Sequence, residues 1–306
     1  RSSDLMVDLN YDDKLENIEK EMAQWSLRYL TPIGRNTILK SLLLPKLNHL
    51  FVALPNPPDQ KLQNFQKKCF NFIWKGKTDR VKRIVMSQPP KFGGINVPDI
   101  KLTILSQKLL WIKRLNKKSC WVEHAGNFIP RIHIIWLADP LYMNTALVPF
   151  ISNTFWRDVI AAWSMYLQKC YQNMTNISDL KTQSIWYNSN VSIGGKWVEY
   201  SHWIENGVHF ITDMFDNEGR IYSFRHFTTV YNLKTNFLLY QGIKSAITNY
   251  IKRILINDNQ DRSYNPTLPF NVKNIINKIT PSVYRKPTHT DQYIHHLSNH
   301  HPQIKQ

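Results

Sequence analysis

Apolar residues recur at spacings of three and four through most of the chain, a pattern that predicts a mainly α-helical protein. The first such segment covers residues 12–30, in which four apolar side chains share one face: Leu15, Ile18, Met22 and Trp25. Asn10 stands just before two acidic positions and is expected to cap this helix at its N-terminus. Thr31-Pro32 then interrupts the pattern, because proline disfavours the helical conformation of the residue before it.

The same spacings predict three further helices in the first third of the chain. They are expected to run from Pro32 to about Ala53 with a bend at Pro45, from a cap at Asp59 to about Gly76, and from Pro98 to about Leu115. The sequence Phe92-Gly93-Gly94-Ile95 is typical of a tight turn between the last two of them. A compact helical unit is therefore expected at the N-terminus.

After residue 118 the helical spacing weakens, then returns near Asn153 in a segment that reaches about Tyr171. Beyond it, short extended pieces alternate with helical ones until the composition shifts towards Asn, Pro and His. We therefore predict four regions: a helical domain with a basic loop (1–118), an irregular linker (119–153), a mostly helical domain with short β or extended pieces (154–256), and a tail expected to be disordered (257–306).

Charge narrows the choice of partners. Lys and Arg number 39 against 22 Asp and Glu among 306 residues, which gives a formal net charge of +17 and favours a polyanionic partner. No apolar run reaches the roughly 18–20 residues of a membrane-spanning helix, so we expect no membrane partner. Three widely spaced cysteines favour reduced thiols in an intracellular protein, cytoplasmic or nuclear. The first residues carry neither an initiator Met nor a secretory leader, so we expect a piece of a longer reading frame.

The densest cluster of cations follows the helix that ends near Gly76. It comprises Lys75, Lys77, Arg80, Lys82 and Arg83, next to Trp74 as a candidate stacking partner for bases. A phosphate-binding loop is one interpretation, and a solvated surface loop is the other. Arg35 and Lys40 add cations beside an apolar face. A second basic group, Lys113, Arg114, Lys117 and Lys118, is explained by the preference of cations for a helix C-terminus.

The sequence offers no convincing catalytic or metal site. Tyr11-Asp12-Asp13 lacks the aromatic-x-Asp-Asp order and the flanking strands of a polymerase turn, and is interpreted as a helix N-terminus. Asp213, Asp216 and Glu218 are interpreted as a turn. Four histidines near the C-terminus, at 295, 296, 300 and 301, lack an acidic partner. We therefore expect no cofactor, no small-molecule substrate, and neither polymerase nor nuclease activity.

Several motifs in a fixed order resemble LINE-type non-LTR retrotransposon polyproteins, in the region C-terminal to the reverse transcriptase core. They are Thr31-Pro32-Ile33-Gly34-Arg35, Phe70-Asn71-Phe72-Ile73-Trp74-Lys75-Gly76, Phe92-Gly93-Gly94-Ile95, Trp203-Ile204-Glu205-Asn206-Gly207 and Ile211-Thr212-Asp213-Met214-Phe215. The resemblance covers about residues 11–279. It implies a thumb and connector that grips the template–primer duplex, with the polymerase core of the parent polyprotein as a partner. Many such polyproteins end in a Cys/His zinc knuckle, which this sequence lacks.

The last segment carries a different resemblance. Val283-Tyr284-Arg285-Lys286-Pro287-Thr288 and Ser298-Asn299-His300-His301-Pro302 look like the reverse transcriptase of Penelope-like elements. This implies either a fusion of two elements near Thr280 or a gene model that crosses such a junction.

The sequence thus predicts a non-catalytic fragment of a retrotransposon reverse transcriptase polyprotein that binds the RNA or DNA backbone without sequence preference. A protein-interaction module is the alternative from another class, with its aromatic residues buried against a partner. A decayed open reading frame without a selected activity is the third interpretation.

Overall fold

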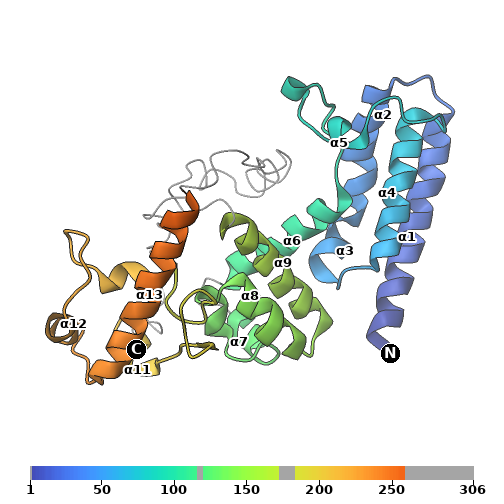
Figure 1. Ribbon diagram of the computed structural model, residues 1–306. Helices are drawn as coiled ribbons and strands as arrows, with labels where there is room; N and C mark the ends of the chain where they lie inside the picture. Colours follow the sequence, from blue (N-terminus) through green and yellow to red (C-terminus); the bar gives the residue numbers. More distant parts are fainter. Residues whose placement is uncertain (1, 116–119, 172–182, 259–306) are drawn as a thin grey trace. The chain divides into compact units, whose positions relative to one another are not determined.

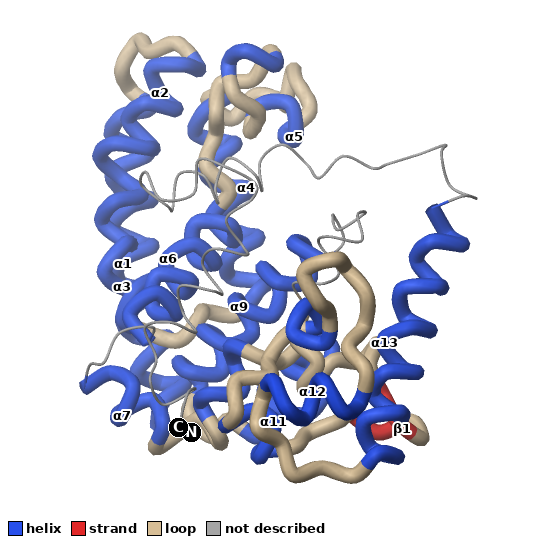
Figure 2. The backbone as a smooth tube through the Cα atoms, turned by 90° about the vertical axis from the view of Figure 1, so that its left-hand side faces the viewer, coloured by secondary structure: helices blue, strands red, loops and turns tan. Residues whose placement is uncertain are grey.

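The computed structural model describes residues 2–115, 120–171 and 183–258. These residues form a mainly α-helical structure with one small two-stranded sheet in the described part, which confirms the expected fold class (Figures 1 and 2). They divide into two compact units. Unit 1 contains the described residues up to 113 together with residues 154–159, and unit 2 contains residues 114–153 and those from 160 onward.

Two long helices of unit 1, α1 (Ser2–Ser26) and α4 (Asp59–Trp74), pack against each other. Leu15, Ile18 and Met22 of α1 are buried in their shared core, as their spacing predicts, whereas Trp25 is only partly buried against it. Tyr11, which was not predicted to lie on this face, is buried there as well. Tyr11-Asp12-Asp13 is helical, as predicted, but it lies inside α1 and not at the N-terminus of the helix. Asn10 lies inside α1 and not at its start, so the predicted N-cap is wrong: the helix extends further towards the N-terminus than the apolar pattern does.

The second helical stretch begins at α2 (Pro32–Ile38), where the Thr31 hydroxyl caps the helix by accepting from the Gly34 N–H at 3.2 Å. It continues as the π turn η1 (Leu39–Leu43), the 3₁₀ turn η2 (Leu44–Leu47) and α3 (Asn48–Ala53). The change of helix type surrounds Pro45, which has no N–H for the regular α pattern. The helix is therefore irregular at Pro45, the position where a bend is predicted.

After α4 the chain forms two short helical turns, α5 (Arg83–Met86) and η3 (Pro90–Phe92), and then enters α6 (Ile100–Leu115). The Gln66 side chain joins α4 to the start of α6, since its oxygen accepts from the Ile100 N–H at 2.9 Å and its nitrogen donates to the Pro98 carbonyl at 3.2 Å. Asp59 is the first residue of α4, with Pro58 in the cap position, one residue away from the prediction.

The prediction of a linker at residues 119–153 is wrong. Residues 120–153 are part of the core of unit 2. They form α7 (Cys120–Gly126), η4 (Ile132–Trp136), α8 (Pro140–Tyr142), η5 (Met143–Leu147) and η6 (Val148–Phe150). Their buried apolar residues include Ile134, Ile135, Met143 and Leu147. The helical spacing was hard to recognise because 3₁₀ and π turns place side chains with a period other than 3.6.

The next helix, α9 (Thr154–Tyr171), agrees with the prediction. The remainder of unit 2 comprises the hairpin of β1 (Ser192–Ile193) and β2 (Lys196–Trp197), then α11 (Ser201–Glu205), η7 (Ile211–Met214), α12 (Phe224–Val230) and α13 (Phe237–Asp258). Gly194 and Gly195, both with positive φ, form the hairpin turn. Trp186, Trp203 and Phe227 are buried here. The tail with its Penelope-like motifs and histidines lies outside the described residues.

Candidate nucleic-acid interface

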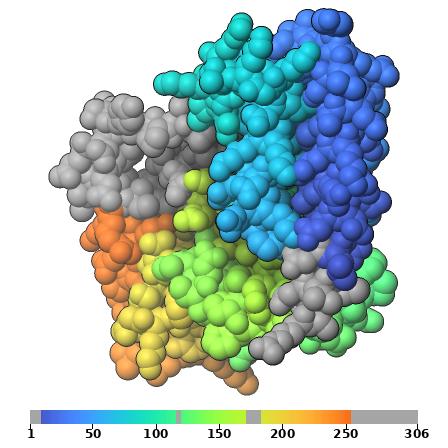
Figure 3. All heavy atoms as spheres, turned by 90° about the vertical axis from the view of Figure 1, so that its right-hand side faces the viewer, coloured from blue at the N-terminus to red at the C-terminus, as the bar shows by residue number. Residues whose placement is uncertain are grey.

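The predicted basic cluster lies in a loop at one end of unit 1, which we call the basic loop (residues 75–92). The loop begins where α4 ends, with Lys75 and Gly76 in the left-handed region at φ of 55° and 72°. Their N–H groups bind the carbonyls of the last turn of α4, a common way to end a helix. Figure 3 shows this part of the chain, in teal, standing out from the helices of the unit.

Backbone hydrogen bonds close the base of the basic loop. The Met86 carbonyl accepts from Ile95 at 3.1 Å and from Val97 at 3.0 Å, and the Gln88 carbonyl accepts from Asn96 at 2.8 Å. Gly94 lies so close to the backbone of residues 85–88 that a Cβ atom on it would stand 2.0 Å from the Gln88 carbonyl oxygen. A side chain does not fit at this position, and Gly93 before it has a φ of 79°, in the left-handed region that favours glycine. The loop is therefore a folded feature with a fixed base.

All five cations predicted to bind phosphate in the basic loop are exposed. Arg83 pairs with Asp79 at 2.7 Å and lies over the Phe70 ring at 4.9 Å, and Lys75 lies 5.7 Å from the Tyr29 ring. Within the described part of the chain, Lys77, Arg80 and Lys82 make no ion pair. Lys91 adds a sixth cation that the prediction omitted, while Asp79 is the only acidic residue in the loop sequence. The loop therefore carries a concentrated positive charge facing solvent.

Arg35 does not belong to this exposed surface, and the prediction of a direct phosphate contact is corrected here. Its side chain is only 3% exposed, and Nη1 donates to the Phe72 carbonyl at 3.1 Å. That carbonyl belongs to the last turn of α4, where a cation is favoured by the helix dipole. The neighbouring Asn36, which the prediction missed, donates from Nδ2 to the Ile95 carbonyl at 2.6 Å. The two residues thus bind the backbone just before and just after the basic loop, at Phe72 and at Ile95.

The burial of Arg35 could have been recognised from spacing. Arg35, Leu39 and Leu43 are four residues apart, and the two leucines are buried. A cation on the apolar face of a helix is more often an internal hydrogen-bond donor than a ligand contact, since buried charges need partners.

The other two predicted contact residues differ from each other. Lys40 is exposed on η1, a different element from the basic loop. Trp74 is half-buried against the core, and its indole nitrogen is buried without a hydrogen-bond acceptor in the described part of the chain. Trp74 is therefore mainly a packing residue. The exposed rings at this end of the unit are instead Tyr29 and Phe92, which the prediction did not include.

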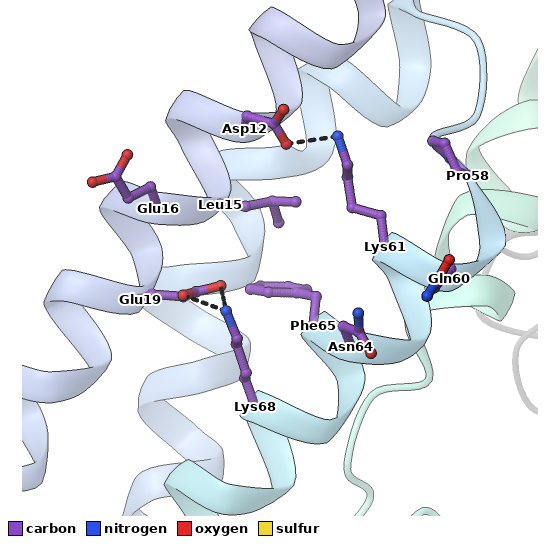
Figure 4. Close-up of a pocket in the computed structure, with 10 residues that line it drawn as sticks. All are labelled: Asp12, Leu15, Glu16, Glu19, Pro58, Gln60, Lys61, Asn64, Phe65 and Lys68. Carbon is purple, nitrogen blue, oxygen red and sulfur yellow. Dashed lines mark hydrogen bonds and ion pairs between the residues drawn. The ribbon is translucent and has the colours of Figure 1, made fainter.

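A second surface of unit 1 carries lysines that are paired with carboxylates. A groove between α1 and α4 is crossed by two ion pairs, Asp12 with Lys61 and Glu19 with Lys68, each at 2.6 Å (Figure 4). Leu15 and Phe65 lie between these pairs in the same view. Three more lysines of the unit have acidic partners: Lys20 with Glu16, Lys46 with Glu21, and Lys101 with Asp59. We call these five residues the paired lysines: Lys20, Lys46, Lys61, Lys68 and Lys101.

The carboxylates singled out in the sequence have structural roles. The Asp213 carboxylate accepts from the N–H groups of His209 and Phe210, and that of Asp216 accepts from Glu218 and Arg220, which confirms the turn interpretation. Among the described residues, no group of three His, Cys, Asp or Glu side chains could hold a metal ion.

Two remaining predictions concern membranes and the second basic group. Over the part of the chain that the structure describes, no helix is long and apolar enough to span a membrane. Lys113 and Arg114 are exposed at the end of α6, and Lys117 and Lys118 lie outside the described residues.

No known protein family has a sequence model that matches the chain.

Proposed function

We propose that unit 1 binds the RNA or DNA backbone through the basic loop, without sequence preference and without catalysis. The observation that carries the proposal is the set of exposed cations, with one acid among them, on a loop whose base is fixed by Arg35, Asn36 and Gly94. Phosphates bind such a surface by releasing counterions, and a fixed base reduces the entropy lost on binding.

The place of this unit in a larger protein is also a proposal. By resemblance it is a thumb and connector of a LINE-type retrotransposon polyprotein, next to the polymerase core of the parent. The support is the order of the motifs together with their structural use: Thr31 and Pro32 begin a helix, Gly76 ends one, and Gly94 permits a close backbone approach.

A protein-interaction module is the second candidate, and one observation favours it. The basic loop exposes two aliphatic side chains, Val81 at 40% and Ile84 at 61%. Apolar side chains on a charged loop would pack against a protein partner such as the missing polymerase core. Under this alternative, nucleic-acid binding is weak and does not depend on the loop cations.

The salt dependence of binding tests the proposal. If all five loop cations contact duplex phosphates, log K should fall with log salt with a slope of about −4.5, at about −0.9 per phosphate. This corresponds to an affinity loss of about 500-fold between 50 and 200 mM salt. Changing Lys75, Lys77, Arg80, Lys82 and Arg83 to Gln should remove most of that slope and weaken binding to all sequences alike.

The second basic group supplies a comparison for this experiment. Changing Lys113, Arg114, Lys117 and Lys118 to Gln should alter the slope much less, because cations at a helix end are explained by the helix dipole. Weak binding by the wild type that is unchanged in the variant of the five loop cations would instead support the interaction module.

A further inference from the structure

Two exposed aromatic rings accompany the cations at this end of unit 1. Tyr29 lies in the turn between α1 and α2 and is fully exposed, while Phe92 lies at the end of the basic loop and is 48% exposed. The α1–α2 turn and the basic loop are at the same end of the unit in two perpendicular views (Figures 1 and 2). The rings therefore border the surface proposed to hold phosphates.

Each ring has a lysine ammonium close to it. Lys75 Nζ is 5.7 Å from the centroid of Tyr29, and Lys91 Nζ is 4.8 Å from that of Phe92. Such contacts keep an ammonium beside the ring and within reach of anything that stacks on it. A nucleotide offers the complementary pair of groups, since its base has an apolar π-face and its phosphate is an anion one backbone step away.

The two exposed rings distinguish single-stranded from double-stranded nucleic acid as the ligand. In a duplex the faces of the bases are covered by neighbouring base pairs, so an exposed protein ring meets no base face there. In a single strand the faces are open, and base–aromatic stacking adds to the phosphate contacts. A duplex would use the cations of the loop and leave both rings in water.

We propose that this end of unit 1 binds single-stranded nucleic acid, with unpaired bases stacked on Tyr29 and Phe92 and adjacent phosphates on the cations of the basic loop. The inference rests on the proposed backbone-binding function and adds the form of the ligand. It selects a polyanion over an apolar protein partner because the ring–lysine pair occurs twice beside a loop with six cations and one acid.

The test uses the full chain and three ligands of equal length, with affinities measured by fluorescence anisotropy. They are a thymidine 12-mer, a 12-mer of abasic sites with the same phosphates, and a 12-base-pair duplex. The thymidine strand should bind at least tenfold more tightly than the abasic strand, because only the former can stack. A uridine 12-mer, measured beside the thymidine strand, distinguishes RNA from DNA as the source of the bases.

Variants of the two rings locate the effect. Tyr29→Ala and Phe92→Ala should each lower affinity for the thymidine strand by about fivefold to a hundredfold, and leave affinity for the abasic strand unchanged. Tyr29→Trp should retain binding, whereas Tyr29→Leu should not, since it keeps apolar area without a ring. Phe150→Ala, at an exposed aromatic residue of unit 2, is the matched control and should change nothing.

The outcomes separate this inference from the proposed function. Equal affinity for thymidine and abasic strands, or Tyr29→Leu as good as wild type, would overturn the stacking role while backbone binding stands. No salt-dependent binding to any of the three ligands would overturn both. Because Tyr29 is fully exposed, its variants should keep the wild-type denaturation midpoint, and this measurement accompanies each titration.

Discussion

Unit 1 holds its cations in three different ways. The paired lysines each have a carboxylate within 3.0 Å, and two of them cross the groove between α1 and α4. The buried cations Arg35 and Lys108 donate to backbone carbonyls. In the basic loop, by contrast, Lys77, Arg80 and Lys82 face solvent without an ion pair in the described part of the chain.

The difference shows which positive charges can act on a distant polyanion. A lysine beside a carboxylate adds little stability on a surface, typically 0–1 kcal/mol, but its field is largely cancelled. A cation without such a partner keeps its field and attracts phosphate. Three such cations, Lys77, Arg80 and Lys82, lie within six residues of the basic loop, and this clustering makes the loop a more specific candidate interface than the net charge of +17 does.

Of the substitutions considered for stability, Phe65→Ala is expected to have the largest effect. Phe65 lies in the groove between α1 and α4 that two ion pairs cross. This ring is buried between α1 and α4, so Phe65→Ala leaves a cavity and should lower the free energy of unfolding by about 3–5 kcal/mol. Urea denaturation followed by circular dichroism gives the value. A loss below about 1 kcal/mol would contradict this expectation, because it would mean that the contact between α1 and α4 contributes little to stability.

A second effect concerns the buried cation Lys108 and depends on pH. Its ammonium donates to the Leu54 carbonyl and lies 4.4 Å from the Phe155 ring, and burial lowers its pKa to about 8. The nearby Asp158, which accepts from the Asn56 N–H at 2.7 Å, opposes that shift. Because the folded pKa lies below the unfolded value of 10.5, stability should increase as pH rises above about 8.

The expected gain between pH 7 and 9.5 is about 2 kcal/mol, from the difference between the folded and unfolded pKa values. The control is Lys108→Met, in which this gain should be absent, and the quantity of interest is the difference between the two proteins at each pH. Parallel curves for wild type and variant would show that Lys108 is not the titrating group.

Arg35→Met sharpens the comparison further, because it removes a buried cation next to the exposed ones. The cost should be about 1–2 kcal/mol, since the Phe72 carbonyl loses the guanidinium but keeps the Lys75 N–H at 3.3 Å. The salt slope of nucleic-acid binding should stay within one unit of wild type. A slope reduced by a full phosphate at unchanged stability would return Arg35 to the list of contact residues.

The sequence could predict much of unit 1 because its helices have regular apolar spacing, with a clear start at Pro32 and a clear end near Gly76. It could not predict the packing of residues 120–153, whose 3₁₀ and π turns do not follow the 3.6-residue period. At the candidate site, charge density located the basic loop. The exposure of Tyr29 depends on how the turn between α1 and α2 folds, and local composition does not determine that.

The most direct test changes the same amount of charge in the two regions. One variant replaces the paired lysines with Gln, and the other replaces Lys75, Lys77, Arg80, Lys82 and Arg83 with Gln; each lowers the formal charge by five, from +17 to +12. Titration against one duplex at several salt concentrations should show a slope reduced by about four to five in the loop variant and by less than one in the paired variant. Equal reductions would mean that diffuse net charge binds the nucleic acid, and would contradict a site in the basic loop.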